Sequence, residues 1–145
     1  MDASKLDFGQ AKVHEYETQI RERHLDTFGH VNNAQYMVLL EEARWEMITS
    51  RGYGLAKVHE NSVGTVVLEC SIRFRKELKL RELIRIRTKI DSATRMMITL
   101  SHQILKEDGV VAAEAKFLMG CFDLKERKLI SPTSEWISAV PGFRP

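Results

Sequence analysis

Residues 33–51 read NAQYMVLLEEARWEMITSR, and they predict one long helix around which the rest of the chain is organised. Asn32 or Asn33 can cap its N-terminus, and Gly52 can end it. Apolar side chains form two stripes, which consist of Tyr36, Leu40, Ala43 and Met47 and of Met37, Trp45 and Ile48. The charged positions are Glu42, Arg44, Glu46 and Arg51. Because so much of the circumference is apolar, we expect the helix to be buried on more than one side.

Strand-like alternation of apolar and polar residues flanks this helix. One such segment precedes it at 14–23, and four follow it at 68–75, 84–91, 98–104 and 111–121. Asp108-Gly109, between the last two segments, is typical of a hairpin turn. The spacing of the later segments is typical of an antiparallel meander. The pattern therefore predicts a single α+β domain over residues 1–145, with a curved antiparallel sheet of about five strands around the helix.

The composition is that of one globular domain. The chain has 145 residues, of which 43% are hydrophobic and 29% charged. A net charge of +2 gives no argument for nucleic-acid binding, and the lack of an apolar run near 18 residues predicts no membrane span. Residues 1–13 lack the apolar core of a signal peptide. Cys70 and Cys121 fall in apolar strand-like runs, which predicts buried thiols in a reducing cytoplasm. No metal-ligand cluster or phosphate loop stands out, so no cofactor is expected.

The eight residues before and at the helix start, Asp26-Thr-Phe-Gly-His-Val-Asn-Asn33, hold the most reactive groups. Free amides and a partial positive charge at a helix N-terminus can hold a carbonyl oxygen that becomes an oxyanion. Gly29 lets backbone approach a ligand closely, and His30 can move a proton near neutral pH. Together with the Asp26 carboxylate, these groups suit hydrolysis of an acyl group. A turn or cap role for Asp26 and a packing role for His30 remain open on spacing alone.

The pattern Asp-x-x-Gly-His-Val-Asn-Asn, followed by Tyr36 and by Glu-x-Ala-Arg at 41–44, resembles the signature of the hotdog-fold thioesterases. These are the 4-hydroxybenzoyl-CoA thioesterase-like and acyl-acyl-carrier-protein thioesterase groups, and the resemblance covers roughly residues 16–123. It implies a hotdog fold that hydrolyses an acyl-CoA or acyl-carrier-protein thioester. It also implies a homodimer or homotetramer with sites between subunits.

The resemblance assigns roles to the motif residues. Asp26 matches the aspartate that acts as nucleophile or as general base for water. Gly29 matches the glycine beside the thioester, and Asn33 the residue whose backbone N–H polarises the thioester carbonyl. His30 matches a histidine of the acyl-carrier-protein branch, and Tyr36 an aromatic packing position.

Two positions depart from the pattern of relatives. His24 stands where many relatives have a second acid, and Phe28 stands where the acyl-carrier-protein branch has an asparagine. These departures leave the acyl group of the substrate open.

Other residues are candidates outside the motif loop. Helical spacing places Glu41 on an apolar stripe, where it can position water or an active-site loop; a rim position paired with Arg44 is the alternative. Basic side chains can meet the phosphates of CoA, or form a solvated outer face, and they are Arg73, Arg75, Lys76 and Arg95.

Two other functions remain possible for such a chain. One is another acyl-thioester chemistry on the same fold, such as a hydratase, which the motif disfavours. The other is a module that binds acyl-CoA without catalysis, against which the retained Asp26 is the only argument.

Overall fold

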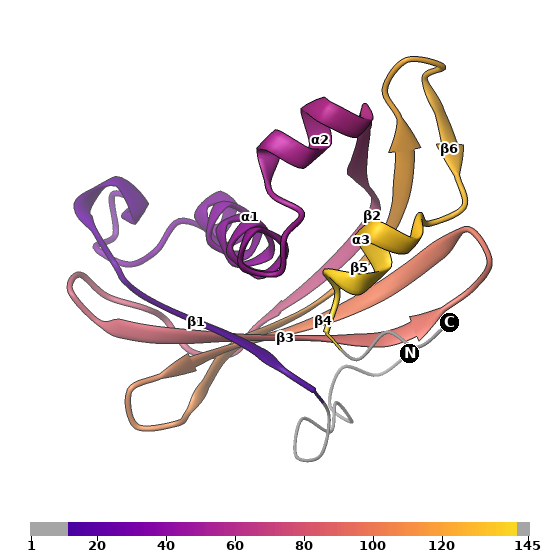
Figure 1. Ribbon diagram of the computed structural model, residues 1–145. Helices are drawn as coiled ribbons and strands as arrows, with labels where there is room; N and C mark the ends of the chain where they lie inside the picture. The colour runs from indigo at the N-terminus through magenta and orange to yellow at the C-terminus, as the bar shows by residue number, and fades with distance from the viewer. Residues whose placement is uncertain (1–11, 142–145) are drawn as a thin grey trace.

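The computed structural model describes residues 12–141, which form one antiparallel sheet curved around a long helix (Figure 1). The strands are β1 (His14–Gln19), β2 (Val63–Phe74), β3 (Leu83–Ala93), β4 (Met97–Lys106), β5 (Val111–Asp123) and β6 (Lys128–Ile130). The helices are α1 (Asn33–Ser50), α2 (Leu55–Asn61), α3 (Ser134–Ser138) and a 3-10 turn at Glu22–His24. The predicted α+β architecture is therefore confirmed. The prediction that residues 1–13 are not a signal peptide concerns a segment that lies mostly outside the described residues.

The sheet order is β1-β3-β4-β5-β2, with β6 beside β5. The prediction of a simple meander is therefore wrong in part, because only β3, β4 and β5 follow one another across the sheet. Alternation along a strand defines which face is covered, whereas it does not say which strand lies alongside. The hairpin at Gly109 is confirmed, with a positive φ of 87° at this residue and a Lys106 N–H bond to the Val110 carbonyl.

Helix α1 lies on the concave face of the sheet (Figure 1). Asn32 is its N-cap, since its side chain accepts a hydrogen bond from the Ala34 amide at 2.9 Å. The chain turns after Ser50 through Gly52, whose φ is +93°. The first apolar stripe and Ile48 are buried as predicted, whereas Trp45 of the second stripe is 38% exposed, so burial covers mainly the side of α1 that faces the sheet. Burial extends to Arg44, one of the charged positions. This cation is only 8% exposed, because the sheet covers its side of the helix.

Short elements near the C-terminus complete the fold, and the sequence patterns did not predict them. Trp136 of α3 is buried and donates its indole N–H to the Thr65 hydroxyl on β2 at 2.7 Å. The two cysteines differ from the prediction as well: Cys121 is a buried thiol, whereas Cys70 is exposed. Cys70 lies on β2, which has a neighbouring strand only on its β5 side within residues 12–141. None of the described helices is long and apolar enough to cross a membrane.

Candidate active site

The loop before α1 folds into a tight turn around Asp26. The Asp26 amide donates to the His30 carbonyl at 3.0 Å, and the Gly29 amide donates to the Asp26 carbonyl at 3.3 Å. Gly29 has φ +88°, a left-handed conformation that glycine adopts without strain. Asp26 Oδ1 accepts the Phe28 amide at 2.8 Å. One carboxylate oxygen therefore has the turn role left open above, while the other is available for a second contact.

That second oxygen faces a histidine. Asp26 Oδ2 lies 3.5 Å from His30 Nδ1, with both side chains partly open to solvent. The His30 ring also stacks on Phe28, at 6.1 Å between ring centroids, and Phe28 itself is 83% exposed. The structure thus brings together the carboxylate and the imidazole that the motif predicts.

In the first turn of α1, the Asn33 amide is left available. The amides of the next two residues bond to Asn32, whose side chain accepts from Ala34 and whose carbonyl accepts from Gln35, each at 2.9 Å. For the Asn33 amide, no acceptor is found among residues 12–141. An unsatisfied N–H at the positive end of a helix dipole is a ready donor to a developing oxyanion.

These groups share one solvent-open cavity of about 570 Å³. This volume is in the usual range of small-molecule sites, roughly 300–1,000 Å³. Its lining includes Asp26, His30, Asn33, Tyr36, Arg75 and Lys76. Tyr36 is buried and packs edge-on against Phe74 at 4.9 Å, as the packing role predicts. Burial raises the pKa of its phenol, so Tyr36 stays protonated near neutral pH.

The four basic residues predicted to meet CoA phosphates are not gathered in one protomer. Arg75 and Lys76 follow the end of β2 and border the Asp26 cavity, while Arg73 lies exposed on the strand. Arg75 is already engaged, since its guanidinium lies 2.8 Å from Glu114 Oε2. Arg95 lies in the turn between β3 and β4, at the opposite end of the sheet.

The structure also separates Glu41 from Asp26. Eight residues along a helix correspond to about 12 Å of axial rise, so Glu41 is well beyond the Asn33 amide of its own chain. Its side chain is exposed, and no ion pair joins it to Arg44 within the described residues. Glu41 instead borders a different cavity.

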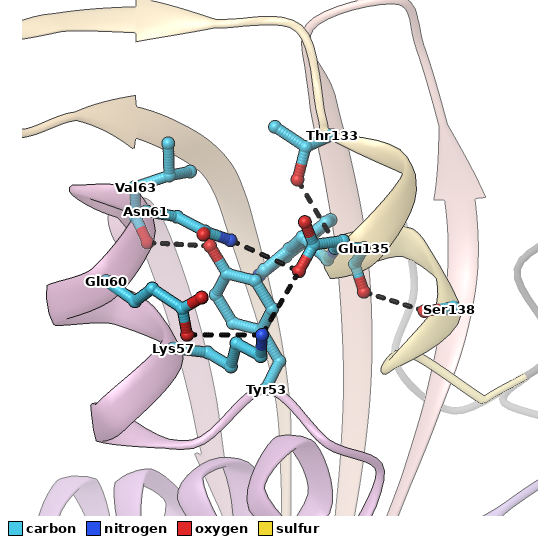
Figure 2. Close-up of polar contacts among 9 residues, drawn as sticks. Tyr53, Lys57, Glu60, Asn61, Val63, Thr133, Glu135 and Ser138 are labelled. Atoms are coloured by element: carbon cyan, nitrogen blue, oxygen red, sulfur yellow. Dashed lines mark hydrogen bonds and ion pairs between the residues drawn. The ribbon is translucent and has the colours of Figure 1, made fainter.

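Sequence reasoning missed this second cavity, of about 370 Å³, between α1 and the sheet. It is lined mostly by apolar side chains of α1, α2, α3 and the sheet. Figure 2 shows how α2 and α3, which both contribute residues to its lining, are joined. Asn61 donates to the Glu135 carboxylate at 3.3 Å, and Lys57 lies 4.0 Å from the same oxygen. Tyr53 donates to the Val63 carbonyl at 3.0 Å, which fixes the start of β2. The cavity escaped prediction because the short elements around it carry no clear periodicity.

A curved antiparallel sheet around one long helix is the arrangement expected of the hotdog-fold thioesterases, and the predicted motif residues Asp26 and Asn33 border one cavity of it. Residues 20–140 match the model of the Thioesterase-like superfamily, and the chain belongs to this family. The predictions of a hotdog-fold thioesterase and of a thioester hydrolase are therefore confirmed.

Individual relatives agree with this membership. The chain is 34% identical over 123 residues to the long-chain acyl-CoA thioesterase FadM of Escherichia coli, covering 82% of this chain and 92% of that protein. The crystal structure of the probable thioesterase YbaW from Escherichia coli is 29% identical, with a TM-score of 0.75 over 86% of this chain and 94% of the other. A 1,4-dihydroxy-2-naphthoyl-CoA thioesterase from Synechocystis shares the fold, with a TM-score of 0.80 at 21% identity over 88% and 95% of the two chains.

Proposed function

We propose that the chain hydrolyses acyl-CoA thioesters in the cavity beside Asp26. The observation that carries the proposal is the meeting of the Asp26 carboxylate and the free Asn33 amide in one solvent-open cavity. The similarity to a long-chain acyl-CoA thioesterase supports CoA, rather than a carrier protein, as the thiol component. The reaction needs no cofactor, and reduced thiols at Cys70 and Cys121 fit a cytoplasmic enzyme.

In this proposal the helix start and the carboxylate have separate tasks. The Asn33 amide donates to the thioester oxygen, whose negative charge grows as the carbonyl carbon is attacked. Asp26 either removes a proton from the attacking water or attacks the carbon itself and forms an acyl-aspartyl anhydride that water then cleaves. In both routes the C–S bond breaks, and the thiolate of CoA leaves and takes up a proton. His30 orients the carboxylate or carries that proton.

We also propose that two copies of the chain complete the site. Strand β2 runs from the second cavity, at Gly64 and Thr65, to the Asp26 cavity, at Phe74. Antiparallel pairing of two β2 edges would bring the Asp26 cavity of one copy towards the apolar cavity of the other. The acyl chain of a thioester bound in the Asp26 cavity of one copy could then extend into the apolar cavity of the other. The two cavities of a single protomer do not offer such a continuous path.

The experiment that tests the reaction is Asp26→Asn, with release of free CoA measured across acyl-CoAs of different chain length. Asn keeps the acceptor for the Phe28 amide and loses the charge and basicity, so turnover should fall on the order of 10²–10⁴-fold with the fold intact. Asp108→Asn is the matched control, because Asp108 accepts the amide two residues on in the same way, outside the cavity.

Three outcomes separate the alternatives. Near-normal turnover in a folded Asp26→Asn variant contradicts the assignment. If the wild-type chain binds acyl-CoA without hydrolysing it, the alternative of a non-catalytic binding module is supported. Single-turnover hydrolysis in ¹⁸O-labelled water distinguishes the two routes, since the label enters the Asp26 carboxylate only if that carboxylate is the nucleophile.

A further inference from the structure

The second cavity combines apolar walls with one buried cation. Its lining includes Trp45, Leu55, Leu100 and Trp136, and Arg44 reaches it from α1. Both tryptophans of the chain are therefore wall residues. Apolar walls favour a hydrocarbon ligand, whereas a buried guanidinium favours an anionic group.

Among residues 12–141, the contacts that hold the Arg44 guanidinium come from the sheet. Its Nη1 lies 3.3 Å from His102 Nε2, and its guanidinium carbon lies 4.1 Å from the centroid of the Phe117 ring. No carboxylate within residues 12–141 lies at ion-pair distance from it. Burial lowers the pKa of Arg44 to about 10, so the side chain is still charged at neutral pH.

The groups around Arg44 do not neutralise it. His102 is fully buried, and burial followed by the nearby Arg44 charge lowers its pKa well below the usual value, so it is neutral near pH 7. Its Nδ1 lies 2.8 Å from the Thr88 hydroxyl, which leaves Nε2 to accept from Arg44. Glu41 favours the charged form of Arg44 through space, yet it is exposed on the cavity rim. A buried charge without a counter-ion is costly, and a ligand anion would remove that cost.

We infer that this cavity is a second binding site, which takes an apolar carboxylic acid. The carboxylate pairs with the Arg44 guanidinium, whose planar fork suits two parallel hydrogen bonds, and the hydrocarbon lies against the apolar walls. The inference goes beyond the proposed hydrolysis, in which this cavity receives only an acyl chain from the partner's Asp26 cavity, because binding of the acid needs neither Asp26 nor a thioester. The carboxylate can belong to a free acid or to the far end of an acyl chain that is itself attached to CoA.

Tryptophan fluorescence reports occupancy directly, since both tryptophans line the cavity. Octanoate should bind at least tenfold more tightly than 1-octanol, because only the acid can pair with Arg44. Arg44→Met should remove that difference, while Arg44→Lys, which keeps the charge, should restore part of it. Equal affinities of the wild-type chain for octanoate and octanol would overturn the inference.

Variants that do not disturb the core provide a second measurement. Leu55 is 55% exposed and lines the cavity, so Leu55→Asp should fold and should weaken octanoate binding through charge repulsion. Leu83→Asp is the matched control, at 51% exposure on β3 and outside the cavity, and should bind octanoate normally. Octanoate affinity that is the same in the Leu55 and Leu83 variants would contradict the inference.

The source of the carboxylate is resolved with the Asp26→Asn variant, in which thioesters persist long enough for binding measurements. Tighter binding of suberoyl-CoA than of octanoyl-CoA, lost on adding Arg44→Met, assigns the site to acyl chains with a distal acid. Octanoate binding without that preference assigns it to free acids. Unchanged octanoate binding in Asp26→Asn shows that the contact with Arg44 does not depend on the reaction, even if the proposed hydrolysis fails. If the variant shows neither behaviour, the inference is wrong.

Discussion

The Oδ2 oxygen of Asp26 lies 3.5 Å from Nδ1 of His30, across a loop that the two residues themselves close. The distance is longer than a good hydrogen bond, so the two groups need a small movement of the loop to make one. Because both side chains are partly solvated, the pair adds little to stability. In the proposed mechanism, the imidazole orients the Asp26 carboxylate or carries a proton for it.

We expect His30→Ala to lower turnover by about tenfold or more, equivalent to roughly 1.4 kcal/mol of activation free energy, without changing the melting temperature much. The reason is that Asp26 loses the group that faces its free oxygen. His59→Ala is the control, since His59 is an exposed histidine on α2 outside the Asp26 cavity. Unchanged turnover on the best substrate would return His30 to a packing role.

The central helix and the motif loop could be read from the sequence because their signals are local. Asn32, the apolar stripes and Gly52 define α1 within about 20 consecutive residues, and the loop from Asp26 to Asn33 needs only its own turns. Chain-order reasoning failed for β2, since strand alternation carries no information about the neighbouring strand.

The second cavity and the burial of Arg44 could not be predicted in this way. The helix pattern does not mark Arg44 as buried, because the groups that surround it come from β4 and β5, roughly 60–70 residues later. Part of the cavity lining comes from α2 and from Trp136 of α3, and a contact joins these two helices. Both helices are too short to give a periodic pattern.

A second prediction concerns the phosphates of CoA. Lys76 borders the Asp26 cavity and has no ion-pair partner within residues 12–141, whereas Arg75 is already paired with Glu114. Lys76→Ala should therefore raise the Michaelis constant for acyl-CoA more than it lowers turnover, the pattern of lost uniform binding. Lys125→Ala, an exposed lysine elsewhere, should leave both constants unchanged.

The same assay with an acyl-pantetheine thioester, which lacks the nucleotide, tests the cause. Lys76→Ala should have little effect on this truncated substrate. An equal rise of the Michaelis constant with both substrates would show that Lys76 does not contact the CoA phosphates.

A third prediction follows from the burial of His102. Its folded pKa is lowered well below 6.5, so below that pH the unfolded chain binds a proton that the folded chain does not. The free energy of unfolding should therefore be unaffected by this group above about pH 6.5. Below that pH it should fall, by up to about 1.4 kcal/mol per pH unit for this one group. Half-buried His14 and buried His24 also have lowered pKa values, chiefly because of burial, and add to the same slope.

Urea unfolding between pH 7.5 and 5 measures this slope. His102→Gln removes the titrating group and should make the slope shallower by about one proton, even though the variant is less stable at every pH. His59→Gln, on the surface, should keep the wild-type slope. A slope in His102→Gln as steep as that of the wild type would show that His102 is not a source of the acid sensitivity.

The last prediction concerns assembly through β2. This strand forms an edge of the sheet within the described residues, and it exposes apolar side chains at Val67, Leu68 and Phe74. An apolar edge with unpaired backbone groups is a template for pairing with another strand, and a second copy of β2 fits it symmetrically. We therefore expect a dimer, or a tetramer built from such dimers, in sedimentation at micromolar concentration.

Cys70 provides a site-specific test, because it is exposed near the middle of β2. Antiparallel pairing about an axis at the strand centre would leave two copies of Cys70 about 10 Å apart, within reach of a short bismaleimide. Cys121 should not react, since it is buried and its pKa is raised to about 11 by burial. The wild-type chain should thus form a cross-linked dimer and Cys70→Ser should not, while both sediment alike. A dimer that Cys70 cannot cross-link would place the interface elsewhere. A fully active monomer would contradict the shared site, because one protomer would then contain everything that the reaction needs.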